Sequence, residues 1–310
     1  MRKVLAILSI LVSLDAFSEA AVKLGDVEAE PFEMVPFGKK IMAREGDNLF
    51  LYQNGSWTNV GKVESPIFSL AANEDEVFAR EANKIFRFDG ASWSNVAEIK
   101  AEPFEMHPFE EGLFVRTGAE IHVFRNNGWT KIAGIEAEPF SMVAVGEDLY
   151  AREADRIYRF RDNGWTQIGQ VLAEPFAFDA TTSGLFTREG SRVRYFSNDS
   201  STWADIGSVA AEPFAMIPSH DTLFVRQGSE LNFYNGSIWS RLYNIEYDRA
   251  FDMTLTERGL YFIDGEQLNL VKTLGMNRVL VKNIDDRIFE IYQSPKYLYT
   301  REGTELYKYE

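Results

Sequence analysis

The feature that most constrains this chain is an internal repeat about 36 residues long. The tetrapeptide Ala-Glu-Pro-Phe recurs, and its phenylalanine marks a position that occurs eight times, at steps of 36, 36, 36, 36, 38, 37 and 38 residues. A fixed period of roughly 20–50 residues is typical of solenoids, propellers and other arrays in which each repeat forms one structural unit. The anchor phenylalanines are Phe32, Phe68, Phe104, Phe140, Phe176, Phe214, Phe251 and Phe289.

The repeat around Phe140 indicates what each unit contains. Short β-prone segments at residues 139–145, 149–152, 156–161 and 165–171 alternate with turns rich in glycine and aspartate. A turn composition therefore recurs about every nine residues, which leaves no room for a helical repeat. Four short strands joined by tight turns are typical of one blade of a β-propeller. The sequence predicts an all-β fold, a single eight-bladed β-propeller with four antiparallel strands per blade.

The two ends of the chain predict how the ring closes. Residues 22–32 align with residues 130–140 at an offset of 108, which is three repeats of 36, so this segment has the pattern of a fourth strand without a blade before it. The last repeat contains three strands and then stops. We therefore expect the N-terminal strand to complete blade 8, which leaves no open seam. The predicted blades span residues 30–65, 66–101, 102–137, 138–173, 174–211, 212–248, 249–285, and 286–310 together with 21–29.

An arginine follows the anchor phenylalanine by twelve residues in seven of the eight repeats, and Ile263 replaces it in the remaining one. In a propeller this position shares a face with the Glu-Pro loop. The arginines therefore either pair with neighbouring glutamates or form a ring that binds an anionic ligand. Their repetition in nearly every blade favours the structural role. These candidate ligand-binding residues are Arg44, Arg80, Arg116, Arg152, Arg188, Arg226 and Arg301.

A tryptophan begins the fourth strand in six repeats. Its ring either packs between adjacent blades or offers a platform on which a sugar ring stacks. Large aromatic side chains dominate protein cores, so packing is favoured here too. The second set of candidate ligand-binding residues is Trp57, Trp93, Trp129, Trp165, Trp203 and Trp239.

The first 20 residues have the pattern of a signal peptide. Arg2 and Lys3 precede an apolar run at residues 4–14, and Ser18 and Ala20 place small residues before a cleavage site. The run is too short to span a bilayer, so we expect cleavage near Ala20 and a periplasmic or secreted protein. The alternative is a buried first strand or helix. The chain contains no cysteine, so packing and not disulfides must hold the fold.

The charge and the missing motifs exclude several functions. A net charge of −15 argues against binding to nucleic acid or insertion at an anionic membrane surface. The three histidines occupy unrelated repeat positions and predict no zinc site. Nucleophile-elbow, phosphate-loop and calcium-loop motifs are missing, so we expect no metal and no cofactor. The acids that follow the repeat least are Asp179, Asp248, Asp252, Asp285 and Asp286.

One stretch of the chain carries a family resemblance. Between Trp129 and Trp165 it contains Trp-x-x-Ile-x-Gly, Leu-Tyr-Ala-Arg, Ile-Tyr-Arg-Phe and Asn-Gly-Trp, in that order. This pattern resembles the tectonin-type propeller repeat. The resemblance implies binding of sugars or surface glycans at sites repeated between blades.

These observations predict a non-enzymatic binding protein, a monomer with several nearly equivalent sites for glycans or cell-surface components. Repetition matters because weak sites combine into strong avidity for a multivalent ligand. One alternative is a protein–protein interaction scaffold of the cell envelope. Another is a propeller hydrolase or lyase, which would need two carboxylates that converge at one end of the channel.

Overall fold

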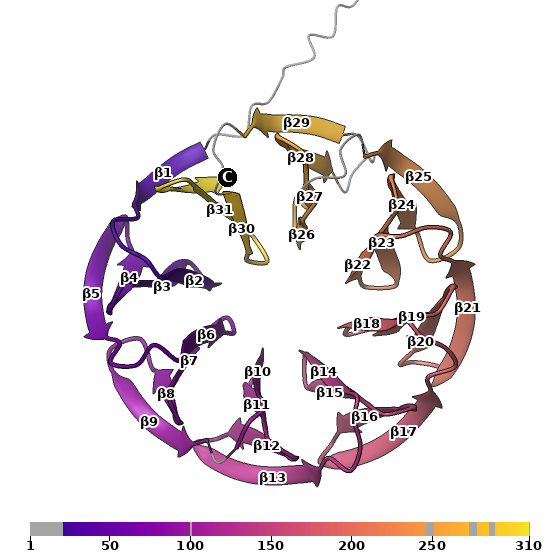
Figure 1. Ribbon diagram of the computed structural model, residues 1–310, viewed down its shortest axis with the longest axis horizontal. Helices are drawn as coiled ribbons and strands as arrows, with labels where there is room; N and C mark the ends of the chain where they lie inside the picture. The colour runs from indigo at the N-terminus through magenta and orange to yellow at the C-terminus, as the bar shows by residue number, and fades with distance from the viewer. Residues whose placement is uncertain (1–20, 100, 246–250, 273–277, 285–288, 310) are drawn as a thin grey trace, which may run out of the picture.

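The computed structural model describes residues 21–99, 101–245, 251–272, 278–284 and 289–309. Within these ranges every regular element is a β-strand, and the strands form eight antiparallel four-stranded sheets. The sheets are arranged as blades around a central axis (Figure 1). The predicted eight-bladed propeller is therefore confirmed. The predicted signal peptide lies outside the described residues, so export remains a prediction.

Each blade has a simple up-and-down order, with its first strand innermost and its fourth strand outermost (Figure 1). From blade 1 to blade 8 the strands are β2 (Phe32–Phe37), β3 (Lys40–Glu45), β4 (Asn48–Gln53) and β5 (Ser56–Lys62); β6 (Phe68–Ala72), β7 (Val77–Glu81), β8 (Lys84–Phe88) and β9 (Trp93–Glu98); β10 (Phe104–Phe109), β11 (Gly112–Thr117), β12 (Glu120–Arg125) and β13 (Gly128–Gly134); β14 (Phe140–Val145), β15 (Asp148–Glu153), β16 (Arg156–Arg161) and β17 (Gly164–Gln170); β18 (Phe176–Thr181), β19 (Gly184–Glu189), β20 (Arg192–Ser197) and β21 (Thr202–Ser208); β22 (Phe214–Ser219), β23 (Thr222–Gln227), β24 (Glu230–Tyr234) and β25 (Trp239–Asn244); β26 (Met253–Thr256), β27 (Gly259–Asp264), β28 (Gln267–Lys272) and β29 (Arg278–Asn283); and β30 (Phe289–Gln293), β31 (Leu298–Glu302), β32 (Glu305–Tyr309) and β1 (Ala21–Asp26).

The turn between the second and third strands of a blade explains two of the repeated residues. In blade 5 this turn contains Gly190, whose φ of +61° lies in the left-handed region that favours glycine. A Cβ atom at this position would lie 3.0 Å from the Cβ of Ala173, in the loop that enters the blade. A glycine and a small alanine therefore face each other where two loops approach closely.

The ring closes through the N-terminal strand, as predicted. Strand β1 pairs antiparallel with β32, with Ala21 opposite Tyr309 and Asp26 opposite Glu305. Across the same pair, Lys23 Nζ lies 2.5 Å from Glu305 Oε1. Because the last blade takes one strand from the start of the chain, both ends of the described chain are held in one sheet.

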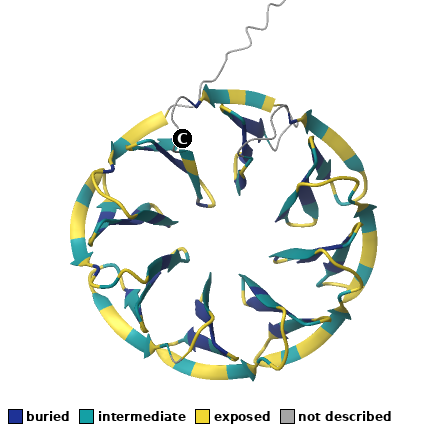
Figure 2. Ribbon diagram, in the orientation of Figure 1, coloured by how far each residue is buried: buried dark blue, intermediate teal, exposed yellow. Residues whose placement is uncertain are grey.

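The core is divided among the interfaces between neighbouring blades. In one such cluster Phe78 and Ile85 of blade 2 pack against Leu113, Val115 and Phe124 of blade 3. Figure 2 shows that the buried residues concentrate in the middle strands of the blades, whereas the outermost strands contain exposed and partly buried residues. Burying one large apolar side chain contributes about 1.5–3 kcal/mol, so the interfaces between blades supply most of the stability. Any site between blades is consequently built on the core itself.

The described residues contain no helix long and apolar enough to cross a membrane.

Candidate functional site

The repeated arginines lie between blades and contact the next blade. Arg152 is typical: its guanidinium lies 4.7 Å from the ring centroid of Phe176 in blade 5, and its Nε donates to the Ala154 carbonyl at 2.8 Å. The other six stack in the same way on the next anchor phenylalanine, at 4.4–5.0 Å. Such cation–π contacts contribute about 0.5–2 kcal/mol each, depending on burial.

Five of these arginines also form ion pairs with the glutamate of the following Glu-Pro loop. The pairs are Arg80–Glu102, Arg116–Glu138, Arg152–Glu174, Arg188–Glu212 and Arg301–Glu30. All five Glu-Pro peptide bonds are cis. The arginine hydrogen bond lowers the pKa of the glutamate in the two pairs Arg301–Glu30 and Arg188–Glu212.

These contacts support the structural interpretation of the arginines. Six of the seven are buried, and Arg80 is partly buried. Because the cationic groups are already stacked and hydrogen-bonded inside the protein, an anionic ligand would have to displace those contacts. A role for the seven arginines in ligand binding stays a prediction.

The tryptophans form a second contact between blades, nearer the rim. The fourth strand of each blade contains a β-bulge, in which one residue leaves the regular ladder and its carbonyl is available to another donor. In blade 3 the bulged residue is Ile132, and its carbonyl accepts the indole N–H of Trp165 from blade 4 at 3.0 Å. The same bond joins Trp57 to Leu24, Trp129 to Val96, Trp203 to Ile168 and Trp239 to Ile206.

The residue after each of the six bulges that face a tryptophan is glycine or alanine, because the tryptophan ring lies against it. A Cβ atom on Gly169 would lie 3.0 Å from Nε1 of Trp203, and one on Gly61 would lie 3.5 Å from Trp93. Trp93 differs from the others, since its indole nitrogen is buried and makes no hydrogen bond within the described part of the chain. All six tryptophans are half-buried, so each keeps some exposed surface.

Between the arginine and tryptophan contacts, three blade interfaces contain a groove open to the surface. The volumes are about 230 Å³ between blades 8 and 1, 230 Å³ between blades 2 and 3, and 210 Å³ between blades 3 and 4. We call them the 8–1, 2–3 and 3–4 grooves. Shared lining positions relate them: the 2–3 groove includes Thr117, His122 and Trp129, and adding 36 to each number gives Glu153, Tyr158 and Trp165 of the 3–4 groove. The corresponding residues of the 8–1 groove are Glu45, Phe50 and Trp57.

Each groove has a tryptophan wall, a second ring, and a polar residue from the end of the second strand. In the 3–4 groove, Glu153 Oε1 accepts the backbone N–H groups of Glu136 and Ala137, the second at 3.3 Å. Its other oxygen, Oε2, makes no hydrogen bond to the described residues. Glu45 of the 8–1 groove has the same arrangement with Glu28 and Ala29. Each of these carboxylates fixes a loop with one oxygen and lines a groove.

At the interface between blades 4 and 5, a side chain of the protein itself lies against the equivalent tryptophan and glutamate. Arg194 stands where blade 4 has Tyr158, and its guanidinium lies 4.5 Å from the ring of Trp203. Its Nη1 donates to Glu189 Oε1 at 3.0 Å, and Glu189 Oε2 accepts the Leu172 N–H at 2.9 Å. Glu189 therefore divides its two oxygens between a loop and a cation.

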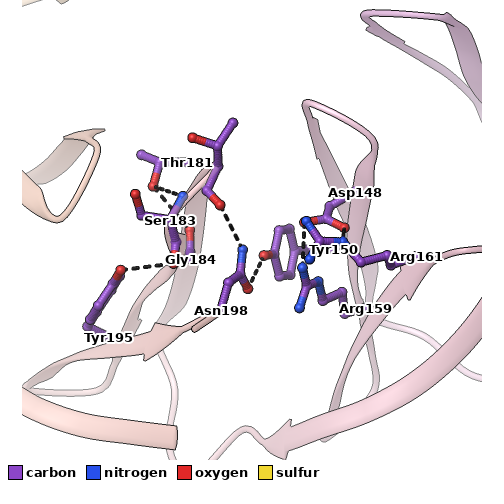
Figure 3. Close-up of polar contacts among 10 residues, drawn as sticks. Asp148, Tyr150, Arg159, Arg161, Thr181, Ser183, Gly184, Tyr195 and Asn198 are labelled. Carbon is purple, nitrogen blue, oxygen red and sulfur yellow. Dashed lines mark hydrogen bonds and ion pairs between the residues drawn. The ribbon is translucent and has the colours of Figure 1, made fainter. Parts of the chain in front are cut away.

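A polar network occupies the opposite face, between blades 4 and 5 (Figure 3). Asp148, 1% exposed, accepts hydrogen bonds from Arg159 at 2.9 Å and Arg161 at 2.7 Å. The Tyr150 hydroxyl donates to Asn198 Oδ1 of blade 5 at 2.8 Å, and burial raises the pKa of Tyr150 to about 12. Because these groups already bond to one another, the network fastens two blades together.

Two of the five acids that follow the repeat least, Asp179 and Asp252, lie in the described residues, and they do not pair with each other. Burial raises the pKa of Asp179 to about 6 and also raises the pKa of Asp252. They lie in blades 5 and 7, and the side-chain carboxylate of each accepts only the N–H of its following residue among the described contacts. Asp248, Asp285 and Asp286 lie outside the described residues. Across the described ranges, no group of three or more His, Asp or Glu residues could hold a metal ion.

The sequence analysis selected the tryptophans of the grooves but missed their other walls. The acid follows each repeated arginine directly in most blades, and thus has a signal of its own. The second ring of each groove comes from the position eighteen residues after the anchor phenylalanine, which we call the ring position. The residue type at this position differs strongly between blades, whereas the positions beside it repeat. Variation at one position of an otherwise regular repeat is the signal that could have indicated a binding surface. In order around the ring, this position holds Phe50, Phe86, His122, Tyr158, Arg194, Asn232, Asn269 and Tyr307.

No model of a known protein family and no curated protein matches this sequence. Solved structures do match. The chain is similar to BamB from Moraxella catarrhalis, with 12% identity and a TM-score of 0.59, covering 94% of this chain and 98% of that one. It is also similar to the WD40 domain of SCAP from fission yeast, with 9% identity, a TM-score of 0.57, and 94% and 98% coverage. Hsv2 from Kluyveromyces lactis matches with 11% identity, a TM-score of 0.58, and 80% and 97% coverage. These likenesses identify the fold as a β-propeller, and the resemblance to tectonin-type repeats stays a prediction.

Proposed function

We propose that this protein is a non-enzymatic propeller that binds partner proteins. Side chains of the partner occupy the grooves that recur between neighbouring blades. We further propose that this binding takes place in the periplasm or outside the cell, after cleavage near Ala20. The observation that carries this proposal is the recurrence of one groove, built from the same repeat positions, at three blade interfaces.

The size of the grooves supports a side chain as the occupant. Pockets for whole small molecules have volumes of roughly 300–1,000 Å³. Each groove here is 210–230 Å³, which suits one side chain or one ring better than a larger molecule. Grooves at different blade interfaces can be occupied together only by a long or multivalent ligand, and avidity then strengthens weak single contacts.

The chemistry of the grooves supports a role in binding. In the 8–1 and 3–4 grooves the strand-end carboxylate holds a loop through its first oxygen, and a tryptophan and a second ring form the walls. Such walls are equipped to contact a ligand and hold it in place.

Glycan recognition is the second candidate, and the 2–3 groove favours it. There Thr117 replaces the glutamate, so a hydroxyl stands beside Trp129 and His122. Glu98 adds a carboxylate to the same groove, and the Thr117 hydroxyl also donates to the Ala101 carbonyl at 3.0 Å. An aromatic face beside polar groups is suited to stacking against a sugar ring. The prediction from the sequence, binding of glycans or cell-surface components, therefore has one groove that fits it.

Parallel selections distinguish the two candidates. Residues 21–310 would be used to select peptides from a random phage library and to probe a glycan array. The control is a triple variant, F50R/H122R/Y158R, which places arginines where blade 5 already has Arg194. We expect enriched peptides whose affinity falls about tenfold or more in this variant. Peptides that bind both proteins equally, or no enriched peptides at all, would contradict the proposal, and glycan binding lost in the variant would favour the second candidate.

A further inference from the structure

Contacts within the protein indicate which kind of side chain binds in a groove that contains a glutamate. In blade 5 the guanidinium of Arg194 lies on Trp203 and pairs with Glu189. These two partners occupy the repeat positions that Trp165 and Glu153 occupy in the 3–4 groove. A cation is thus bound by two of the walls that are open one blade earlier, with Asp205 as a further partner at 3.4 Å.

A second basic side chain contacts the equivalent glutamate between blades 7 and 8, and it comes from a different strand of the blade. Lys282 belongs to β29, the outermost strand of blade 7, and its ammonium pairs with Glu302 of blade 8. It also lies 5.5 Å from the ring of Tyr307. Glu302 and Tyr307 stand thirteen and eighteen residues after their anchor, as Glu153 and Tyr158 do. Two unrelated basic side chains therefore pair with the acid at the same repeat position, thirteen residues after the anchor phenylalanine.

We infer that the 8–1 and 3–4 grooves each bind the basic side chain of an arginine or lysine from a partner protein. This inference rests on the proposed function and names the partner's chemistry. Each groove offers a carboxylate oxygen without a hydrogen bond in the described structure, next to a tryptophan and a second aromatic ring. A carboxylate beside aromatic faces attracts a cation by ion pairing and by cation–π contact together.

The charges around the grooves support the same occupant. Asp26 and Glu28 line the 8–1 groove, and Glu136 lines the 3–4 groove. Two basic residues of the chain contact the edges of these grooves: Lys23 pairs with Asp26 and Glu305, and Arg156 donates to the Tyr158 hydroxyl at 3.4 Å. Neither forms an ion pair with Glu45 or Glu153 in the described structure, so these two carboxylates keep an oxygen for a ligand. The net charge of −15 attracts a basic segment from a distance. Arginine fits better than lysine because its planar guanidinium can stack and hydrogen-bond at once.

The test uses a synthetic peptide of alternating arginine and glycine with blocked ends, titrated calorimetrically into residues 21–310. A matched peptide carries citrulline, which keeps the shape of arginine but lacks its charge. We expect saturable binding that weakens with salt, and at least about tenfold weaker binding of the citrulline peptide. Equal affinity for the two peptides would overturn the inference.

Variants of the protein complete the test. In E45Q/E153Q the glutamines can still hold their loops, because blade 6 has Gln227 at this position and its Oε1 accepts the Ala210 N–H at 2.9 Å. We expect this double variant to unfold like the parent and to bind the arginine peptide at least about tenfold more weakly. T117E adds the missing acid to the 2–3 groove and is expected to tighten binding. An unchanged affinity in E45Q/E153Q would contradict the inference.

The outcome also separates this inference from the proposed function. If library peptides without basic residues bind and F50R/H122R/Y158R abolishes their binding, the grooves bind proteins but not through cations. If neither the library nor the arginine peptide binds, both proposals fail.

Discussion

Blades 4 and 5 have the same architecture, but they differ in what lies between each blade and the blade before it. Trp165 and Trp203 both bond to a bulge carbonyl of the preceding blade, at 3.0 and 2.7 Å. Glu153 and Glu189 both accept a loop N–H. At the ring position, however, blade 4 has Tyr158 and an open groove, whereas blade 5 has an arginine that fills it. The two interfaces therefore differ at this position, and also at Asp205, which pairs with Arg194 where blade 4 has Gln167.

The comparison separates two kinds of repeated residue. The arginines and tryptophans make the contacts that hold blade to blade, so their replacement disturbs the ring. The ring position lies between these contacts, and it accommodates aromatic, basic and amide side chains in different blades. A propeller can thus change its ligands blade by blade without changing its scaffold.

The largest effect is expected from removing one of the six tryptophans. Trp165→Ala should lower the free energy of unfolding by about 3 kcal/mol, near the lower end for a core aromatic, because a half-buried ring and its hydrogen bond are lost. Trp203→Ala should cost the same to within about 1 kcal/mol, since Arg194 loses its stacking partner there and Tyr158 loses its edge contact in Trp165→Ala. Urea denaturation followed by circular dichroism measures both values. A difference of several kcal/mol would show that the two contacts are not equivalent.

The sequence was sufficient to predict the fold because the repeat constrains it at several levels. The spacing of Phe32 to Phe289 fixed the number of blades, and turn residues fixed four strands in each. The segment at residues 22–32 matched an interior fourth strand, and β1 indeed pairs with β32. Local pattern and ring closure agree, which is the condition for a reliable inference from sequence.

The grooves could not be predicted in the same way. Their walls come from adjacent blades, so residues such as Ala133 and Trp165 meet only after the blades stack. The β-bulge at Ile132 also has no signal of its own in the sequence, although it supplies the carbonyl that orients the tryptophan. Repeat position alone indicated Trp165 but could not decide whether it would be covered or exposed.

The next effect in size concerns the filled groove. Arg194→Tyr copies blade 4 into blade 5 and should lower the free energy of unfolding by about 2–3 kcal/mol, because Glu189 is only 1% exposed and would lose its cation. The same change should open the groove between blades 4 and 5. Denaturation measures the stability, and titration with the arginine peptide measures the new site. A variant as stable as the parent would mean that the Arg194–Glu189 pair contributes little.

A smaller effect is expected at the turn that follows the second strand. Blade 4 has Ala154 with φ +51°, whereas blade 5 has Gly190 with φ +61°. Ala154→Gly should raise the free energy of unfolding by up to about 1 kcal/mol, because glycine adopts this conformation without the strain of a Cβ atom. Gly190→Ala should lower it by about 1–2 kcal/mol, since its Cβ would also approach Ala173 at 3.0 Å. Changes of the same sign in both variants would contradict this explanation.

The smallest stability effect is expected from Tyr158→Arg, which copies blade 5 into blade 4. The new arginine can stack on Trp165 and pair with Glu153, gains of about 0.5–1 kcal/mol for the stacking and at most about 1 kcal/mol for the partly exposed ion pair. It loses the edge contact between Tyr158 and Trp165, whose centroids are 6.4 Å apart, a cost of about 0.5–1.5 kcal/mol. These terms nearly cancel, so the free energy of unfolding should change by less than about 1 kcal/mol, while the 3–4 groove becomes filled and no longer binds the arginine peptide. A stability loss of several kcal/mol in denaturation would show that blade 4 cannot accept the arrangement of blade 5, and that more than one residue separates an open groove from a filled one.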